Sequence, residues 1–133
     1  MAQETTKTAA QLVAEAKGRT ENLTPGAVAA ELATGEAVLV DLREPAERAQ
    51  HGAIAGAVHA PRGMLEFYAD PTSPYHRPEF DPDRRTILHC ASGGRSALAA
   101  DTLRQLGYSN VAHLEGGLNA WKETGRAVEP GEA

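Results

Sequence analysis

The chain is poor in cysteine, since Cys90 is the only one among its 133 residues. A single cysteine excludes an internal disulfide and argues against a cysteine-based zinc site. Most lone cysteines fill space in a core, so Cys90 is either a buried filler or a reactive thiol. The five histidines show no metal-ligand spacing, and we expect no metal site: His51, His59, His76, His89 and His113.

Aromatic residues make up only 5% of the chain, and positive charge is in deficit. The 13 Lys and Arg residues are scattered against 18 Asp and Glu residues, so the net charge of -5 argues against a nucleic-acid partner. No window approaches the roughly 20 apolar residues that span a bilayer. The first residues lack the basic and apolar regions of a secretory signal, so we expect a cytoplasmic protein with no membrane partner.

Short apolar runs alternate with helical patterns along the chain. The patterns predict strands over 37–41, 57–60, 86–89 and 111–114, and helices over 5–17, 25–35, 45–50, 62–69, 94–106 and 118–124. This alternation predicts an α/β fold, with three layers (α/β/α) around a central, mainly parallel sheet. We expect a helical extension over 1–20, one domain over 21–127 and a tail over 128–133. The extension either packs on the domain or contacts a second copy.

A glycine-containing loop follows the strand at 86–89 and begins with Cys90. Ligands of open parallel sheets bind beyond the carboxyl ends of the strands, where this loop lies. Two glycines allow backbone N–H groups to converge, and the following helix start adds unpaired donors and a positive dipole end. Such a cradle stabilises a thiolate. The expected anion-binding residues are Ala91, Ser92, Gly93, Gly94, Arg95 and Ser96.

The alternative is a glycine turn that only joins strand to helix. Because a cysteine opens the loop and Arg95 supplies a planar fork of donors near its end, we favour a catalytic loop. Ser96 stands at the helix start, where its hydroxyl either caps the loop or touches the sulfur, and we expect the cap.

Four segments resemble the rhodanese family of sulfurtransferases. The loop Cys90-Ala91-Ser92-Gly93-Gly94-Arg95-Ser96 resembles the family's active-site loop. Residues 38–44 (VLVDLRE) resemble its strand ending in D-x-R, residues 52–57 (GAIAGA) its G-H-I-P-G-A segment, and residues 114–121 (LEGGLNAW) its E-G-G-x-x-x-W segment. The resemblance covers about residues 22–125 and implies the rhodanese-like fold.

The resemblance also implies a reaction. Cys90 would take a sulfane sulfur from a donor such as thiosulfate or a persulfide, hold it as a covalent persulfide, and pass it to cyanide, a thiol or an acceptor protein. No metal or organic cofactor is required. Two alternatives stay open: a sulfur-relay or regulatory module with little turnover alone, and an oxyanion reductase or phosphatase on the same fold. Four residues separate Cys90 from Arg95, whereas related phosphatases have five, which favours sulfur transfer.

The chain departs from the family pattern in two places. Residues 52–57 lack the histidine and proline of G-H-I-P-G-A, and Ala91 stands where many sulfurtransferases have a charged residue. Thiosulfate is a dianion, so one loop cation fewer counts against it as the donor. Arg62 could supply the missing charge. Asp41 and Arg43 lie at a strand end, where we expect a structural ion pair rather than a catalytic role.

Other conspicuous residues have structural interpretations. His59, His89 and His113 lie in expected strands as hydrogen-bonded core or rim residues, and strand alternation turns His89 away from Cys90. Trp121 is expected in the core. Residues 63–82 form either a lid or docking surface for an acceptor protein, or an insertion that packs on itself; their aromatic residues are Phe67, Tyr68, Tyr75 and Phe80.

Overall fold

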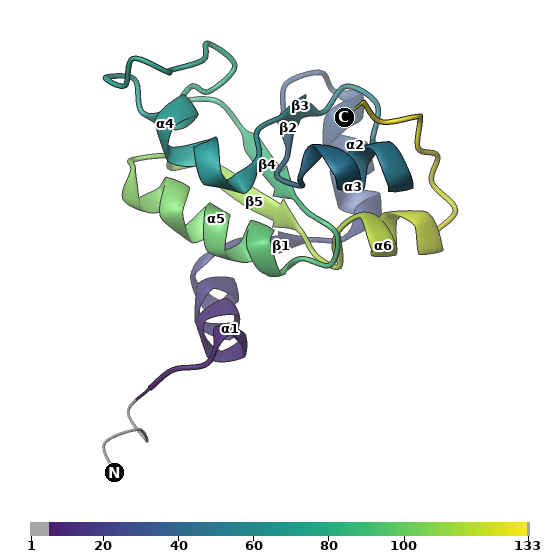
Figure 1. The fold of residues 1–133 in the computed structure, drawn as a ribbon, viewed down its shortest axis with the longest axis horizontal. Helices are drawn as coiled ribbons and strands as arrows, with labels where there is room; N and C mark the ends of the chain where they lie inside the picture. The colour runs from purple at the N-terminus through teal and green to yellow at the C-terminus, as the bar shows by residue number, and fades with distance from the viewer. Residues whose placement is uncertain (1–5, 133) are drawn as a thin grey trace.

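Five short strands form the centre of the computed structural model, which describes residues 6–132 (Figure 1). They are β1 (Glu21–Leu23), β2 (Val38–Asp41), β3 (Val58–His59), β4 (Thr86–His89) and β5 (Val111–Leu114), in the order β1-β5-β4-β2-β3. Every neighbouring pair is parallel. All five carboxyl ends therefore meet at one edge of the sheet, where parallel sheets bind their ligands.

Helices cover both faces of this sheet. They are α1 (Ala9–Arg19), α2 (Pro25–Ala33), α3 (Pro45–His51), the 3₁₀ turn η2 (Arg62–Met64), α4 (Leu65–Ala69), α5 (Gly94–Gln105) and α6 (Gly117–Glu123). Helices α4 and α5 lie on one face, and α2, α3 and α6 lie on the other (Figure 1). The predicted three-layer α/β/α fold is therefore confirmed. Within the described range, no helix combines the length and the apolar character needed to cross a membrane.

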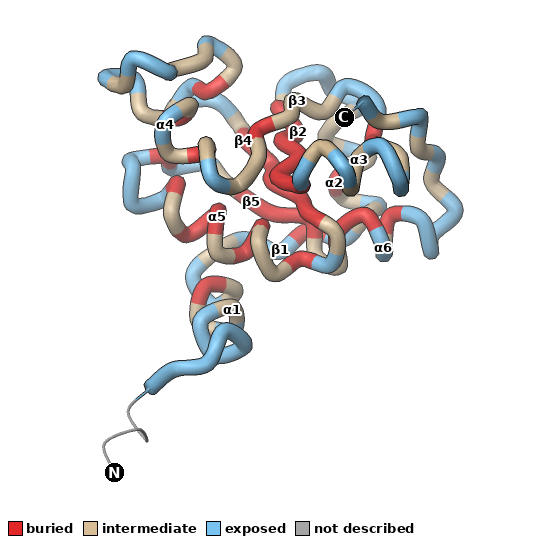
Figure 2. Tube along the Cα trace, in the orientation of Figure 1, coloured by how far each residue is buried: buried red, intermediate tan, exposed pale blue. Residues whose placement is uncertain are grey.

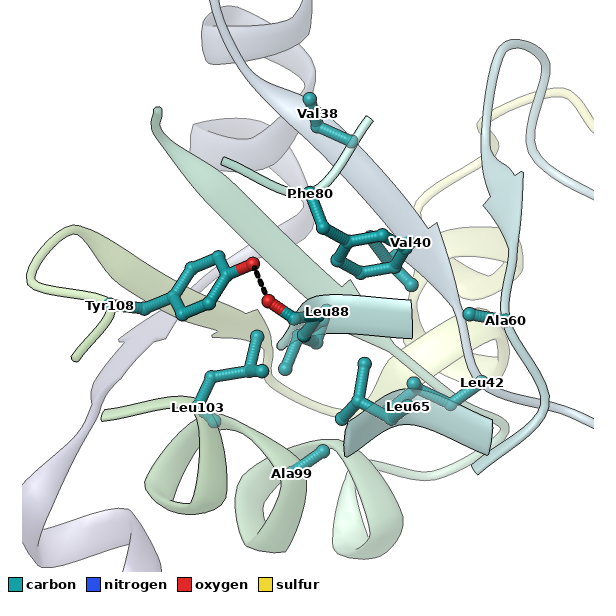
Figure 3. Close-up of a cluster of buried hydrophobic side chains, with 12 residues drawn as sticks. Val38, Val40, Leu42, Ala60, Leu65, Phe80, Leu88, Ala99, Leu103 and Tyr108 are labelled. Carbon is teal, nitrogen blue, oxygen red and sulfur yellow. Dashed lines mark hydrogen bonds between the residues drawn. The ribbon is translucent and has the colours of Figure 1, made fainter. Parts of the chain in front are cut away.

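Alternating strand residues build two apolar cores. Val40 and Leu88 face α4 and α5, whereas Leu39 and Ile87 face α2 and α6. Figure 2 shows the central strands buried along their length. In the first core the Tyr108 hydroxyl donates a hydrogen bond of 2.8 Å to the Ala69 carbonyl oxygen, drawn as a dashed line in Figure 3. Burial of the Tyr108 ring raises the pKa of its phenol to about 12.

Strand β1 was not predicted from the sequence. Residues 21–23 carry only one buried side chain, Leu23, because β1 is an edge strand with one neighbour. Three residues are too few to show a two-residue alternation, so the sequence indicated only the start of α2 at Thr24 and Pro25.

The expected N-terminal extension packs on the domain. Helix α1 packs against α5, and Arg19 forms an ion pair of 3.0 Å with Asp101. Thr8 caps α1, so the helix expected over 5–17 begins later and ends at Arg19. Residues 1–5 of the expected extension and residue 133 of the expected tail lie outside the described residues. Near that tail, Glu129 pairs with Ala53 in an antiparallel bridge.

Candidate active site

Cys90 lies directly after β4, at the carboxyl edge of the sheet. Its side chain is buried, with 1% of the residue exposed. The chain turns at Gly93, whose φ of 105° lies in the left-handed region that only glycine adopts freely. This turn aims the Gly93 N–H at the Cys90 Sγ, at 3.2 Å. The sulfur therefore sits at the start of α5, where unpaired N–H groups and the helix dipole favour negative charge.

Backbone N–H groups at the start of α6 donate hydrogen bonds to carbonyl oxygens of the same loop. Leu118 N–H donates to the Cys90 carbonyl oxygen at 2.9 Å, and Asn119 N–H donates to that of Ala91 at 3.0 Å. The loop can approach the first turn of α6 this closely only because Gly117, the residue before Leu118, has no side chain. A Cβ atom at Gly117 would lie 2.5 Å from the Ala91 oxygen, and its φ is +60°. The glycine pair at 116–117 thus fixes the position of the Cys90 loop.

Ser96 touches the sulfur instead of capping the helix. Gly93 is the N-cap of α5, and no side chain caps it, so the expected cap was wrong. The Ser96 hydroxyl lies 3.7 Å from the Cys90 Sγ and 2.9 Å from Nδ1 of His113. All three residues are buried. The Ser96 hydroxyl also lies 3.3 Å from the Gly93 carbonyl oxygen, so it contacts the loop as an additional partner.

Arg95 reaches from the Cys90 loop to α3. Its two Nη groups donate to the Glu47 carboxylate at 2.8 and 2.9 Å, so part of the donor fork expected to close the loop binds Glu47. The Glu47 hydrogen bond raises the pKa of Arg95, with a further contribution from nearby Cys90. In turn Arg95 lowers the pKa of Glu47 to about 2, helped by the Glu44 backbone N–H.

Asp41 and Arg43 form the expected ion pair beneath the site. Two nitrogens of the Arg43 side chain donate to the Asp41 carboxylate at 2.9 and 3.0 Å, and both residues are buried. Arg43 also donates to the Gly52 carbonyl oxygen, which ties in the G-A-I-A-G-A segment. Burial alone would raise the pKa of Asp41, but the Arg43 hydrogen bonds bring it down to about 2.

The buried histidines take different partners. His89 directs its ring toward Asp41, with Nε2 at 3.7 Å from the carboxylate, and burial lowers its pKa. His59 contacts the Arg43 carbonyl oxygen at 2.6 Å. His89 Nδ1 also contacts the Cys90 carbonyl oxygen at 3.2 Å, so His59 and His89 each make a hydrogen bond as expected from the sequence, whereas His89 Nε2 has no hydrogen-bond partner among the described residues. Residues 6–132 contain no group of three or more His, Cys, Asp or Glu side chains that could hold a metal ion.

The Arg62 guanidinium binds Glu66 on the next helix at 3.0 Å. A different cation lies near Ala91. An open pocket of about 260 Å³ lies beside the loop, and Lys122 contributes to its wall. The lining residues are Arg43, Glu47, His51, Ala91, Leu118, Asn119 and Lys122. Sequence reasoning missed Glu47 and Lys122, which come from separate helices and carry no motif of their own.

The segment 63–82 packs largely on itself and on the core. Phe80 is buried in the first core, and the Arg77 guanidinium lies 5.0 Å from the centre of the Tyr68 ring. Phe67 and Tyr75 are exposed and make an edge-to-face contact. In Figure 1 the loop after α4 lies at the upper left, well away from the turn between β4 and α5. It therefore does not cover Cys90 as a lid.

Comparisons with known proteins agree with this geometry. A family model described as rhodanese-like domain matches residues 24–124. A solved structure of a protein of unknown function, possibly a tyrosine phosphatase, from Rhodopseudomonas palustris is 41% identical, with a TM-score of 0.88, over 93% of this chain and 96% of that one. The thiosulfate sulfurtransferase structure from Pseudomonas aeruginosa is 31% identical, with a TM-score of 0.75, over 94% of this chain and 23% of that one.

A curated relative gives the same family assignment. The thiosulfate sulfurtransferase GlpE of Actinobacillus succinogenes is 31% identical over 72% of this chain and 78% of its own length. Three other curated relatives are longer, and the chain spans 44%, 63% and 61% of their lengths.

Proposed function

The chain belongs to the rhodanese-like domain family, and from that premise we propose that it is a sulfurtransferase that carries a sulfane sulfur on Cys90. The family match and the relatives named thiosulfate sulfurtransferase support sulfurtransferase activity as the general function. The persulfide on Cys90 and the choice of donor are our proposals for this chain.

One observation carries the proposal: the Cys90 Sγ lies at the start of α5 and accepts the Gly93 N–H at 3.2 Å. Fixed N–H donors and the helix dipole stabilise a thiolate, and they equally stabilise the negative outer sulfur of a persulfide. The α6 hydrogen bonds to the loop carbonyl groups hold these donors in place before any substrate arrives.

The two half-reactions balance without an added redox agent. The Cys90 thiolate attacks the outer sulfur of thiosulfate, a new S–S bond forms, the old one breaks, and sulfite leaves with the electron pair. Cyanide or an acceptor thiolate then attacks the outer sulfur of the persulfide. Thiocyanate or a new persulfide is released, and the Cys90 thiolate is regenerated. The carried sulfur is held covalently, so the cycle needs no metal or organic cofactor.

The pocket beside Ala91 is where we place the donor. Lys122 supplies positive charge there, which compensates for the uncharged Ala91 of the loop. A small dianion or a persulfide fits this pocket, and an acceptor thiol on a small molecule or a partner protein would enter by the same opening. Arg62, bound to Glu66, remains a weaker candidate for this charge.

A phosphatase is the second candidate, because the Rhodopseudomonas palustris neighbour is described as a possible tyrosine phosphatase. A phosphate would need N–H groups of Arg95 to bind its oxygens, and two of the five that this side chain carries are bound to Glu47. The loop also has one residue fewer than phosphatases of this kind. Sulfur transfer therefore remains our proposal. The other alternative, a sulfur-relay module with little turnover alone, would use the same Cys90 persulfide and would differ from our proposal only in passing the sulfur to a partner protein.

The deciding experiment is the intact mass of the protein after incubation with thiosulfate, with Cys90→Ser as control. We expect a gain of one sulfur atom that cyanide removes and that the control lacks. No gain, together with hydrolysis of p-nitrophenyl phosphate, would replace our proposal with the phosphatase. A persulfide that resists cyanide and small thiols but passes to one partner protein would indicate the relay module.

A further inference from the structure

A continuous chain of contacts leads from the buried Cys90 sulfur to the exposed Asn22 and is not used by the sulfur-transfer steps above. Cys90 Sγ contacts Ser96 Oγ at 3.7 Å, and Ser96 Oγ contacts His113 Nδ1 at 2.9 Å. On the other side of the ring, His113 Nε2 contacts Asn22 Oδ1 at 2.7 Å. Four elements supply these groups: the loop after β4, α5, β5 and the edge strand β1.

The proton positions in this chain follow from Asn22. Its side-chain Nδ2 donates to the Lys17 and Thr20 carbonyl oxygens, which fixes the orientation of the amide. The Asn22 Oδ1 therefore faces His113, and His113 Nε2 must carry the hydrogen. The opposite nitrogen, Nδ1, is then bare and can only accept.

Ser96 links this bare nitrogen to the sulfur. A serine hydroxyl has one proton, and the shorter of its two acceptor contacts is to His113 Nδ1, at 2.9 Å against 3.3 Å to the Gly93 carbonyl oxygen. With its proton so placed, the Ser96 oxygen accepts from the Cys90 thiol. All donors point the same way, from Cys90 toward His113.

We propose that His113, acting through Ser96, takes up the thiol proton of Cys90. The Cys90 proton passes to Ser96 Oγ as the Ser96 proton passes to Nδ1, which leaves a thiolate and an imidazolium and no net change of charge. His113 thus acts as a positioning residue for the thiolate. The route is needed because Cys90 is buried and has little contact with bulk water.

The surroundings of His113 suit this exchange. The Glu115 carboxylate lies 3.4 Å from Nε2 and favours the imidazolium, and Lys17 from α1 forms an ion pair with the same carboxylate. Burial lowers the pKa of His113, which keeps its ring neutral at neutral pH. This effect opposes the imidazolium, so the proposed transfer depends on Glu115 and on the Cys90 thiolate formed in the same step. Ser96 from α5 and Asn22 from β1 complete its polar contacts and carry no charge.

The test is the pH dependence of Cys90 alkylation by iodoacetamide, which reports the thiolate and uses no sulfur donor. His113→Asn keeps an acceptor for Ser96 but cannot take up a proton, and Ser96→Ala breaks the link. We expect each variant to slow alkylation about tenfold at pH 7 and to raise the midpoint of the rate curve by about one pH unit. The double variant should be no slower, because both changes interrupt one chain.

A third variant, at the exposed Asn22, works in the opposite direction, although it gives up the two hydrogen bonds from Nδ2 to the Lys17 and Thr20 carbonyl oxygens. Asn22→Asp places a carboxylate against Nε2, so the midpoint should fall. His76→Asn, in the loop at 70–83, is the matched control and should leave the curve unchanged. Circular dichroism checks the fold of each variant. A folded His113→Asn protein with the curve of the unaltered chain, or additive effects in the double variant, would overturn the relay.

This inference rests on the proposed function only for the identity of the reacting thiol. If thiosulfate adds no sulfur but the alkylation shifts appear, the proposed function fails and the relay stands. If sulfur is added but the shifts are absent, the relay alone fails.

Discussion

At the scale of single residues, the arginine side chains around Cys90 already form ion pairs with carboxylates. Asp41 binds both Arg43 and Arg48, and Glu47 binds Arg95. Lys122 is exposed, and it lines the pocket beside Ala91 together with His51. An incoming anion therefore meets Lys122 as the mobile cation of this pocket, because the arginines already hold carboxylates.

Replacing this cation should weaken donor binding with little change in turnover. We expect Lys122→Ala to raise the KM for thiosulfate about fivefold, since one exposed charge contributes on the order of 1 kcal/mol. Steady-state transfer to cyanide measures the effect, which should shrink in high salt. Lys7→Ala is the control, because Lys7 pairs with Glu15 away from the pocket. Equal KM values for both variants would remove Lys122 from the donor site.

At the scale of elements, α6 supports the active loop from outside it. Its first turn donates two backbone hydrogen bonds to the loop, and Gly117 leaves no room for a side chain between them. The E-G-G-x-x-x-W segment therefore positions the active loop. Gly117 leaves space for the loop to pack against α6, and Trp121 is buried in the second core and holds α6 in place.

A single methyl group at Gly117 should displace the loop. We expect Gly117→Ala to reduce sulfur transfer by about tenfold to a hundredfold, because small misplacements of reacting groups have large effects on rate. Gly35→Ala is the matched control: Gly35 also has a positive φ (78°) but open space around its Cα. Gly35→Ala should lose about 1 kcal/mol of stability through backbone strain, and Gly117→Ala should lose more, because its Cβ also overlaps the Ala91 carbonyl oxygen. If both retain full transfer, α6 does not position the loop.

The sequence allowed the strands β2 to β5 and the loop to be predicted, because each strand is an apolar run followed by turn residues. The pairs Arg95–Glu47 and Ser96–His113 could not be predicted. They join positions 48 and 17 residues apart, and no local periodicity reports such contacts. The same holds for Asn22, whose role depends on a strand of three residues at the edge of the sheet.

At the scale of the whole molecule, several buried groups make stability depend on pH. Burial lowers the pKa of His89 and of His113 below 6.5. The carboxyls of Asp41 and Glu47 have pKa values of about 2, below their ordinary 3.8 and 4.5. In each case the unfolded chain binds the proton more readily, so stability falls as pH falls. Tyr108, with its pKa raised to about 12, contributes stability that is lost above pH 10.

The free energy of unfolding should therefore be highest between about pH 7 and 9. We expect it to decline below about pH 6.5 and to fall more steeply below about pH 4.5, with Asp41 alone contributing about 2 kcal/mol to the acid limb. Urea unfolding at a series of pH values measures this profile. A free energy that stays constant from pH 7 to pH 3 would contradict the assigned burial of these groups.

The pairing of β1 with β5 also sets an order of assembly. It joins residues 21–23 to residues 112–114, so the first strand in the chain cannot take its place until the last has been synthesised. Contacts of such high sequence separation form late in folding, because the loop between them must close first. On the ribosome, the edge strand waits unpaired while β2, β3 and β4 emerge. The arrival of β5 both completes the sheet and brings Asn22 to His113, so the Cys90 loop gains its full set of contacts only after β5 has been synthesised.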